Sequence, residues 1–406
     1  MTAAACGRIF REGEVRTYRA SALLFAAALL LPAGAPARAD PVTVGIQASF
    51  SGPFSIWGKE YREGAELMLG QLGGTAGGHR IRIVYGDDGG DNPQRAQQLA
   101  QEMIVRDGAA VIGGSDLTPD TLAVTKIINQ AKVPFVIFNT GTASVTDKSP
   151  YFVRIAQTNW STYYPLGVWA AREGHEKRCV AVVADYAPGL DSLAAVKRGF
   201  EGNGGTLIGQ ILVPLSTVDF SAYIQRIRDL SPDCTFIFMP LGPQSATFVK
   251  AYTGAGLMKA GVRLLGQSET WEADLPALGD DALGIITAFP YGPNLDNPAN
   301  RAFVQAFAAK YHAAPTMIAV LGYDGMRVMA KMVEATGGKP DGAAAVAAVK
   351  GFAWNSPRGP VSIDPRTREL VQPVYIRQVV KEGGRYVNKV IYTFPDEKEP
   401  WHELNR

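Results

Sequence analysis

Short apolar runs alternate along this chain with longer segments whose apolar residues recur every three or four positions. Runs of the first kind are typical of buried strands, and segments of the second kind are typical of amphipathic helices. The first part predicts strands at 42–48, 81–85, 109–112 and 134–138, and helices at about 58–72 and from Asn92 to Gly108. This alternation favours an α/β fold with a parallel, doubly wound sheet that helices cover on both faces.

A second alternating block begins near residue 179. It predicts strands at 179–184, 207–213, 235–239, 263–266 and 284–288, and helices at 190–202, 220–229, 243–255, 298–312 and 316–336. The end of the chain changes character, with antiparallel strands expected at 359–363, 374–380 and 389–392. The 406 residues are enough for two domains.

Two dipeptides in the first block look like helix starts. Asn92-Pro93 and Thr118-Pro119 each combine a capping side chain with a proline at the first helical position. We therefore expect the side chains of Asn92 and Thr118 to cap helices.

The first 39 residues have the pattern of a secretory signal peptide. Basic residues precede an apolar stretch from Ala22 to Leu31, and the small-residue sequence at 37–39 offers a cleavage site after Ala39. The apolar stretch is shorter than the roughly 20 residues that a membrane-spanning helix needs. We expect an exported, periplasmic protein whose mature chain begins at Asp40; the alternative is a buried N-terminal helix.

Loss of the first 39 residues would leave two cysteines, Cys179 and Cys234, each at the start of a predicted strand. An oxidising periplasm would allow them to pair, but two cysteines do not make a disulfide-rich scaffold. We expect two buried thiols.

The composition excludes several classes of function. The formal net charge is only +2, which gives no argument for a nucleic-acid or acidic-membrane partner. No nucleotide-binding or hydrolase motif is found, and the four histidines are scattered, so we expect no catalytic residue, metal or cofactor. Asp87, Asp88 and Asp91 resemble part of a calcium loop without its closing glutamate, and we interpret them as a strand-to-helix loop.

Three predicted strands of the first block end in loops rich in glycine and hydroxyl residues. These loops contain Ser51-Gly52-Pro53, the segment 113–118 and the segment 139–144. Ligands of open α/β sheets bind at the carboxyl ends of strands, where hydroxyls, free N–H groups and helix N-termini suit an anion. The alternative is that these serines and threonines only cap helices.

Several segments resemble type I periplasmic binding proteins of the branched-chain amino acid group. They are VGIQASFSGPFSIWGKEYREGAEL (44–67), GDDGGDNPQRAQQLAQEMI (86–104), VIGG (111–114), ADYAPG (184–189) and RGPVSIDPRTRELVQPVYIRQVV (358–380). The resemblance covers essentially the whole mature chain. It implies two Rossmann-like lobes with doubly wound parallel sheets, joined by three crossovers, and a ligand between them. The lobes would comprise 40–157 plus 291–353 and 158–290 plus 354–406.

The resemblance also implies which positions line the ligand site. Trp57 would cover the ligand, Thr140, Gly141 and Thr142 would hold a head group, and Tyr186 would close over it from the second lobe. Glu269 stands near the position of an acid that binds the ligand ammonium, although Ser268 or Trp271 could occupy that place instead.

The sequence departs from the family pattern at two of these positions. Leu117, beside Asp116 and Thr118, stands where a head-group serine is expected, and Leu241 replaces an aromatic residue. These departures argue against an α-amino acid, and the aromatic set Trp57, Tyr186, Trp271 and Tyr291 is compatible with a planar ligand.

The resemblance implies a monomer that captures a small amphipathic solute (an amino acid, aromatic acid or amide) by hinge closure and hands it to an inner-membrane ABC permease. A ligand sensor of the same fold, or a periplasmic hydrolase, is the alternative.

Overall fold

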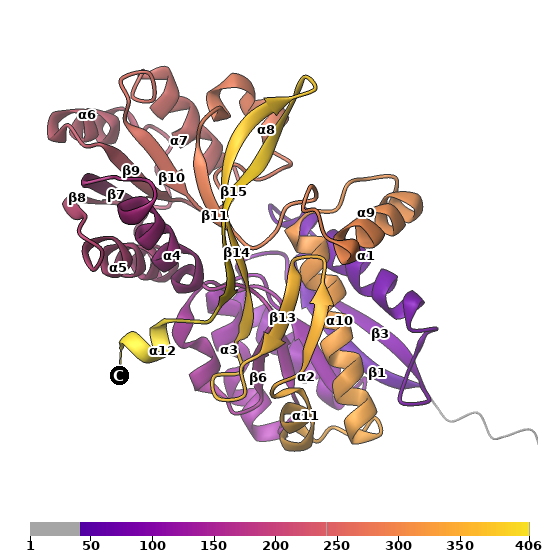
Figure 1. Ribbon diagram of the computed structural model, residues 1–406. Helices are drawn as coiled ribbons and strands as arrows, with labels where there is room; N and C mark the ends of the chain where they lie inside the picture. Colours follow the sequence, from indigo (N-terminus) through magenta and orange to yellow (C-terminus); the bar gives the residue numbers. More distant parts are fainter. Residues whose placement is uncertain (1–40, 241, 406) are drawn as a thin grey trace, which may run out of the picture. The chain divides into compact units, whose positions relative to one another are not determined.

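The computed structural model describes residues 41–240 and 242–405, which contain two β-sheets (Figure 1). The strands of the first sheet are, in spatial order, β2 (Thr75–Ala76), β3 (His79–Asp87), β1 (Val42–Ala48), β4 (Val111–Gly114), β5 (Phe135–Ile137) and β6 (Phe152–Arg154). All neighbours pair in parallel except the short β2–β3 hairpin. The strand order reverses at β1, which therefore marks the switch point of a doubly wound sheet.

Helices cover both faces of this sheet, as the alternation predicts. One face carries α1 (Ser55–Gln71) and α10 (Met317–Thr336), and the other carries α2 (Pro93–Val105) and α3 (Thr118–Ala131). Alternate residues of β1 and β4 point to opposite faces, so Val44 and Val111 pack in one core cluster and Ile112 packs in the other. At this switch point Gly114 lies so close to β1 that a Cβ there would collide with the carbonyl oxygen of Gln47.

The second sheet is parallel on one side and antiparallel on the other. Its strands are, in spatial order, β12 (Ala353–Ser356), β13 (Gly359–Ile363), β14 (Leu370–Glu382), β11 (Ile286–Phe289), β10 (Arg263–Gly266), β9 (Cys234–Phe238), β7 (Arg178–Ala184) and β8 (Thr206–Val213), with β15 (Arg385–Glu397) pairing to β14. The order β9-β7-β8 makes a second switch point at β7. The antiparallel strands expected at the end of the chain are β13, β14 and β15.

The helices that accompany the second sheet form its hydrophobic core with it. They are α4 (Asn159–Arg172), α5 (Ala187–Glu201), α6 (Ser221–Leu230), α7 (Pro243–Gly254) and α8 (Leu275–Leu278). The remaining helical segments are η1 (Ala143–Lys148), η2 (Gly279–Ala282), α9 (Pro298–Tyr311), α11 (Gly342–Val349) and α12 (Trp401–Leu404).

The chain passes between the two cores three times. The first passage follows β6 and leads into α4, and the second follows β11 and leads to α9 and α10. The third passage is β14 itself, because Leu370 packs in the core of the first sheet and Val374 in the core of the second. The expected fold of two α/β halves with mostly parallel sheets is therefore confirmed.

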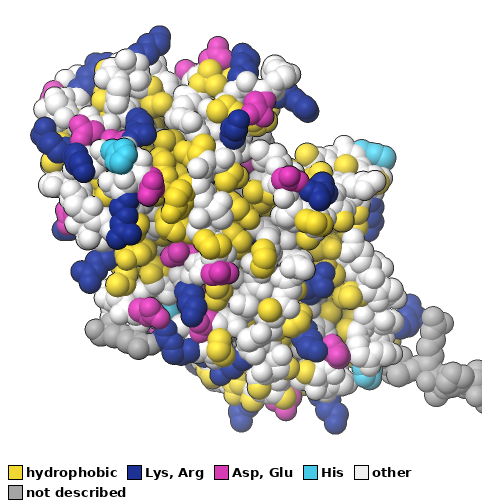
Figure 2. Space-filling model, in the orientation of Figure 1, with side chains coloured by type: hydrophobic (Ala, Val, Ile, Leu, Met, Phe, Trp, Pro, Cys, Tyr) yellow, Lys and Arg dark blue, Asp and Glu magenta, His cyan; other side chains and the backbone are white. Residues whose placement is uncertain are grey.

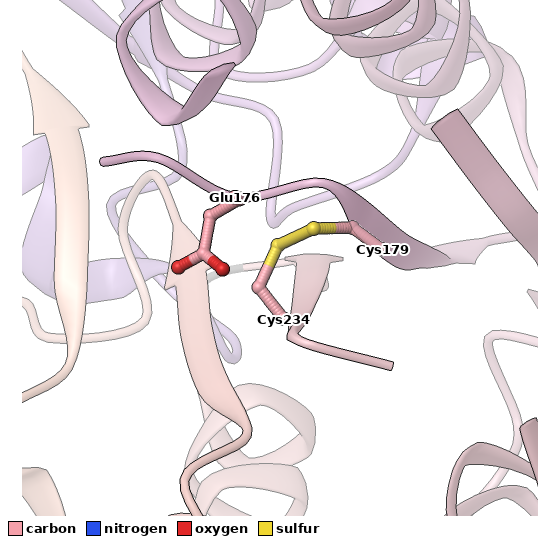
Figure 3. Close-up of side chains that lie close together, drawn as sticks. All are labelled: Glu176, Cys179 and Cys234. Atoms are coloured by element: carbon pink, nitrogen blue, oxygen red, sulfur yellow. A yellow bond between two sulfur atoms is a disulfide. The ribbon is translucent and has the colours of Figure 1, made fainter. Parts of the chain in front are cut away.

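The prediction of two buried thiols is wrong, because Cys179 and Cys234 form a disulfide. They are direct partners in the parallel pair β7–β9, with Cα atoms 4.7 Å apart. Figure 3 shows the carboxyl group of Glu176 beside the two joined sulfurs. The disulfide joins two strands that are neighbours at the second switch point. The spacing of the cysteines in the sequence does not reveal that these strands are neighbours, so the pairing could not be predicted from it.

Candidate functional site

The carboxyl ends of the strands at both switch points surround one cavity of about 480 Å³. The loops after β1, β4 and β5 contribute from the first sheet, and the loops after β7, β9 and β10 contribute from the second. This volume lies within the usual range for sites that enclose a small organic ligand.

The wall of the cavity is mostly apolar. Its aromatic residues are Phe54, Trp57, Tyr186, Phe238, Trp271 and Phe289. Its uncharged polar residues are Thr118, Asn139, Gln157, Asn159, Gln244, Gln267 and Ser268. Among the described residues that line the cavity there is no lysine, arginine or histidine, so an anionic ligand would be held by neutral donors.

The N-terminus of α3 supplies such donors. Leu117 is the N-cap of this helix, and no side chain makes a capping hydrogen bond there. The prediction that Thr118 caps the helix is therefore wrong: Thr118 is already in the first turn, whereas Asn92 does cap α2 by accepting the N–H of Arg95 at 3.1 Å. The uncapped N–H groups and the positive end of the helix dipole adjoin the cavity through Leu117 and Thr118.

Arg154 organises the loop after β5 from inside the protein. Its guanidinium is fully buried and donates to three carbonyl oxygens of the loop 140–143, at 2.6, 2.7 and 2.9 Å. The fourth carbonyl, that of Gly141, accepts the N–H of Asn159 at 2.9 Å. Glu369 balances the arginine with two contacts of 2.7 and 2.8 Å. Because these carbonyls are all turned toward protein donors, the loop can offer N–H groups to the cavity, which Gly141 lines.

A chain of hydroxyl groups joins the loops after β4 and β5. Thr118 Oγ1 and Thr142 Oγ1 lie 3.0 Å apart, and Thr121 Oγ1 lies 2.6 Å from Ser115 Oγ and 2.7 Å from Thr140 Oγ1. Ser115 and Thr140 have positive φ angles of 69° and 100°. Non-glycine residues rarely adopt such backbone conformations, and they are concentrated at functional sites.

A pair of buried carboxyl groups lies beneath the first switch point. Ser49 donates its N–H to Asp116 Oδ2 at 2.8 Å, and its hydroxyl oxygen lies 2.5 Å from the same Oδ2 and 3.0 Å from Asp88 Oδ1. Burial raises the pKa of Asp116 to about 7, and the nearby Asp88 adds to this rise. Asp116 lines the cavity.

The second sheet contributes Tyr186, which follows β7 and is the N-cap of α5. Its ring is stacked against Phe238 at the end of β9, with centroids 6.1 Å apart and an interplanar angle of 21°. Both rings line the cavity, which they reach from the second sheet, whereas the N-terminus of α3 lies beside the first sheet.

The chain matches the sequence profile of the family described as periplasmic binding protein over residues 41–385.

The chain belongs to the periplasmic binding proteins.

Its similar relatives are solute-binding proteins. The Leu/Ile/Val-binding protein homolog 6 of Brucella melitensis is 43% identical over 382 residues, which are 93% of this chain and 97% of that protein. A solute-binding protein of an ABC transporter from Rhodopseudomonas palustris, solved in complex with 4-hydroxybenzoate, is 41% identical. It covers 90% of this chain and 100% of its own, with a TM-score of 0.86. Another, from R. palustris BisB5 in complex with 3,4-dihydroxybenzoic acid, is 37% identical, covers 89% and 99%, and has a TM-score of 0.83.

These relationships establish what kind of protein the chain is. It is a periplasmic binding protein of the leucine-isoleucine-valine group, a family that acts in the periplasm, and the two R. palustris proteins similar to it are solute-binding proteins of ABC transporters. Within residues 41–240 and 242–405, no helix is long and apolar enough to span a membrane. The predicted signal peptide lies outside the described residues.

The structure brings six of the ten predicted site residues of this periplasmic binding protein to the cavity wall. They are Trp57, Asp116, Leu117, Thr118, Gly141 and Tyr186. Thr140 and Thr142 stand behind the wall in the hydroxyl chain, and Leu241 lies outside the described residues. Of the aromatic set, Trp271 lines the cavity, and Tyr291 is fully buried elsewhere.

Glu269 faces away from the cavity of the binding protein. Its carboxylate accepts the N–H of Gln267 at 2.6 Å and of Met239 at 3.3 Å, and burial raises its pKa to about 7. The neighbouring Ser268 and Trp271, which the sequence offered as alternatives, line the wall instead.

Other wall residues were not predicted from the sequence. Met317, Ile318 and Leu321 come from the first turns of α10, and Gln157 and Asn159 come from the first passage between the cores. The three apolar residues give no signal in the sequence, because they continue the periodic face of a buried helix. The polar pair could have been found from its place at a lobe boundary expected near residue 157.

Proposed function

We propose that this periplasmic binding protein captures an aromatic carboxylic acid. The observation that carries the proposal is the composition of the cavity wall: aromatic side chains, neutral donors, and no basic residue among the described ones. A planar ring would lie between Trp57 on the first sheet's side and Tyr186 on the second, where aromatic contacts are favourable.

The carboxylate would lie against the N-terminus of α3. There the backbone N–H groups of Thr118 and Asp120 and the Thr118 hydroxyl would be the donors, since Pro119 has no N–H, and the helix dipole favours negative charge. The two relatives in complex with 4-hydroxybenzoate and 3,4-dihydroxybenzoic acid, at 41% and 37% identity, support the same class of ligand.

The predicted partner of an α-amino acid's ammonium group does not line the cavity. Glu269 is turned to the backbone amides of Met239 and Gln267. The wall does contain the carboxyl groups of Asp91 and Asp116. The preference for an acid without an amino group therefore rests on the aromatic wall and on the relatives in complex with aromatic acids.

The transport cycle follows from this site. After removal of the signal peptide at Ala39, a monomer with lobes 40–157 plus 291–353 and 158–290 plus 354–406 would close on the ligand and deliver it to an inner-membrane ABC permease. Because Trp57 and Tyr186 come from different lobes, the ligand would favour the closed form through contacts that only closure completes. The protein would bind the acid without converting it.

Calorimetric titration and thermal shift with matched ligands test the proposal. We expect 4-hydroxybenzoate and benzoate to bind, and a ligand at 100 times its Kd to stabilise the protein by about 2.7 kcal/mol. Benzamide tests the need for the carboxylate, cyclohexanecarboxylate tests the need for a planar ring, and phenylalanine against 3-phenylpropionate tests the ammonium. Tighter binding of leucine or phenylalanine than of all the aromatic acids would contradict the proposal.

A further inference from the structure

The hydrogen bonds of Ser49 leave one proton to be accounted for. Its hydroxyl carries a single hydrogen, yet the oxygen lies 2.5 Å from Asp116 Oδ2 and 3.0 Å from Asp88 Oδ1. An ionised carboxylate only accepts hydrogen bonds, so one hydroxyl cannot satisfy two of them. Both contacts are hydrogen bonds only if one of the two carboxyl groups carries a proton.

The surroundings of this pair supply no positive charge. Asp116 is faced by Asp88 after β3, by Tyr61 on α1 and by Asp120 on α3. Asp88 is also near Asp87, and Asp120 is near Asp91. No lysine, arginine or histidine takes part in these interactions among the described residues, and Asp88, Asp116 and Asp120 are 1%, 1% and 0% exposed. Two adjacent buried carboxylates without a cation favour protonation of one of them.

We propose that Asp88 and Asp116 share one proton through Ser49, and that this proton allows the cavity to accept a carboxylate ligand. This inference rests on the proposed function, because it concerns the charge of the ligand. Asp116 lines the cavity and lies two residues before the first residue of α3. A negative charge on Asp116 would therefore lie close to the helix N-terminus that would bind the ligand. When the shared proton is on Asp116, the carboxyl group at the cavity wall is neutral and that helix end can bind an anion. In the fully ionised pair Asp116 is negative and repels the anion.

The pair therefore couples capture to pH. Burial raises the pKa of Asp116 to about 7 and also raises that of Asp88. Below this range the proton is already present, and affinity for an anion is constant. Above it, binding must first take up a proton, so the Kd rises by up to tenfold per pH unit. Asp116 and Asp88 would then determine which charge the site selects.

Calorimetry with 4-hydroxybenzoate at pH 6, 7 and 8 tests the coupling. The wild-type Kd should rise about tenfold from pH 6 to pH 8, and buffers of different ionisation heat should show uptake of about one proton at pH 8. In Asp88→Asn and in Asp116→Asn, the ratio of the two Kd values should fall below about two, because the remaining carboxyl no longer shares a proton.

Asp87→Asn is the matched control in the same loop. Asp87 Oδ1 accepts backbone N–H groups of Phe50, Ser51 and Gly89, which lowers the pKa of its carboxyl. It is ionised throughout pH 6–8, so this variant should keep the wild-type ratio. A wild-type Kd that is constant from pH 6 to 8, or an equal loss of pH dependence in Asp87→Asn, would overturn the assignment.

A separate measurement distinguishes this inference from the proposed function. Carboxyl ¹³C NMR of the ligand-free protein, assigned with the two asparagine variants, should show the pair titrating near pH 7. If no aromatic acid binds but this titration is seen, the ligand class is wrong and the shared proton stands. If 4-hydroxybenzoate binds while both carboxyls titrate below pH 5, the shared proton is wrong and the ligand class stands.

Discussion

Individual side chains behind the cavity wall determine which backbone groups a ligand can meet. Arg154 donates to three carbonyl oxygens of the loop 140–143, and Glu269 accepts two backbone N–H groups from the loops after β9 and β10. Neither lines the cavity. Each holds a loop in one orientation, so the wall is pre-organised by buried side chains that do not themselves line it.

Tyr186 is the residue whose direct contribution is simplest to measure. Tyr186→Ala removes a ring that lines the cavity and stacks on Phe238, and loss of one buried aromatic surface costs about 1.5–3 kcal/mol. We expect the Kd for 4-hydroxybenzoate to rise tenfold or more in calorimetry. Tyr186→Phe is the control, which keeps the ring and should bind within about threefold of wild type. An unchanged Kd in Tyr186→Ala would exclude this ring from the ligand site.

At the scale of elements, the disulfide joins two neighbouring strands of the second sheet across 55 residues of sequence. In the chain-entropy treatment, a disulfide that closes a loop of this length in the unfolded chain raises the free energy of unfolding by about 4 kcal/mol. We expect Cys179→Ala/Cys234→Ala to lower the free energy of unfolding in urea by up to this amount. Five residues of strand, roughly 17 Å, separate Cys179 from the end of β7, so the Kd should change less than twofold.

Reductant provides the control for the disulfide. Dithiothreitol present during unfolding should lower the stability of the wild type to that of the double variant and leave the variant unaffected. Equal stability of wild type and variant without reductant would show that the bond is energetically neutral.

The sequence predicts best the elements whose apolar residues follow a clear pattern that ends at turn residues. The strands β10 and β13 have the predicted bounds, because short apolar runs end at clear turn residues. Helix α4 is not predicted, because its residues are buried on nearly all sides and Pro165 lies inside it, so no amphipathic period appears. Its capping box at Thr158 and Ser161 is the one local signal of its start.

The site was predictable only as far as local sequence determines it. The loops after β1, β4 and β5 could be located, since the ends of parallel strands meet at one sheet edge. That Thr140 points to Thr121, or that Glu269 faces backbone amides, depends on backbone angles such as the φ of 100° at Thr140. Those angles are set by tertiary contacts, here the carbonyl bonds of Arg154, which comes from a different strand.

At the scale of the whole molecule, acidic and basic side chains lie on the surface, and a separate set of carboxyl groups lies in the interior. Basic and acidic side chains are interspersed on the face drawn in Figure 2, in keeping with a net charge of +2 over the full sequence. The interior instead holds several carboxyl groups whose pKa values burial raises to about 7. They are Glu60, Asp116, Asp120 and Glu269.

These carboxyls make the stability of the protein depend on pH. Each has a folded-state pKa above its unfolded value near 4, so between about pH 4.5 and 7 the folded state holds more protons than the unfolded state. Stability then falls as pH rises through this window. The opposite holds for Glu369, whose pKa the buried Arg154 lowers, so its contribution is lost only in stronger acid. We expect the urea midpoint to be higher at pH 5 than at pH 8.

Tryptophan fluorescence during urea unfolding measures these midpoints. Glu269→Gln should reduce the difference between pH 5 and pH 8, because the amide cannot ionise and still offers an oxygen to the N–H of Gln267. Glu334→Gln is the control at a side chain that is 53% exposed on α10, and it should leave the difference unchanged. A midpoint that is higher at pH 8 would mean that the buried carboxyls are compensated by cations on folding, which would also remove the physical basis for a proton shared by Asp88 and Asp116.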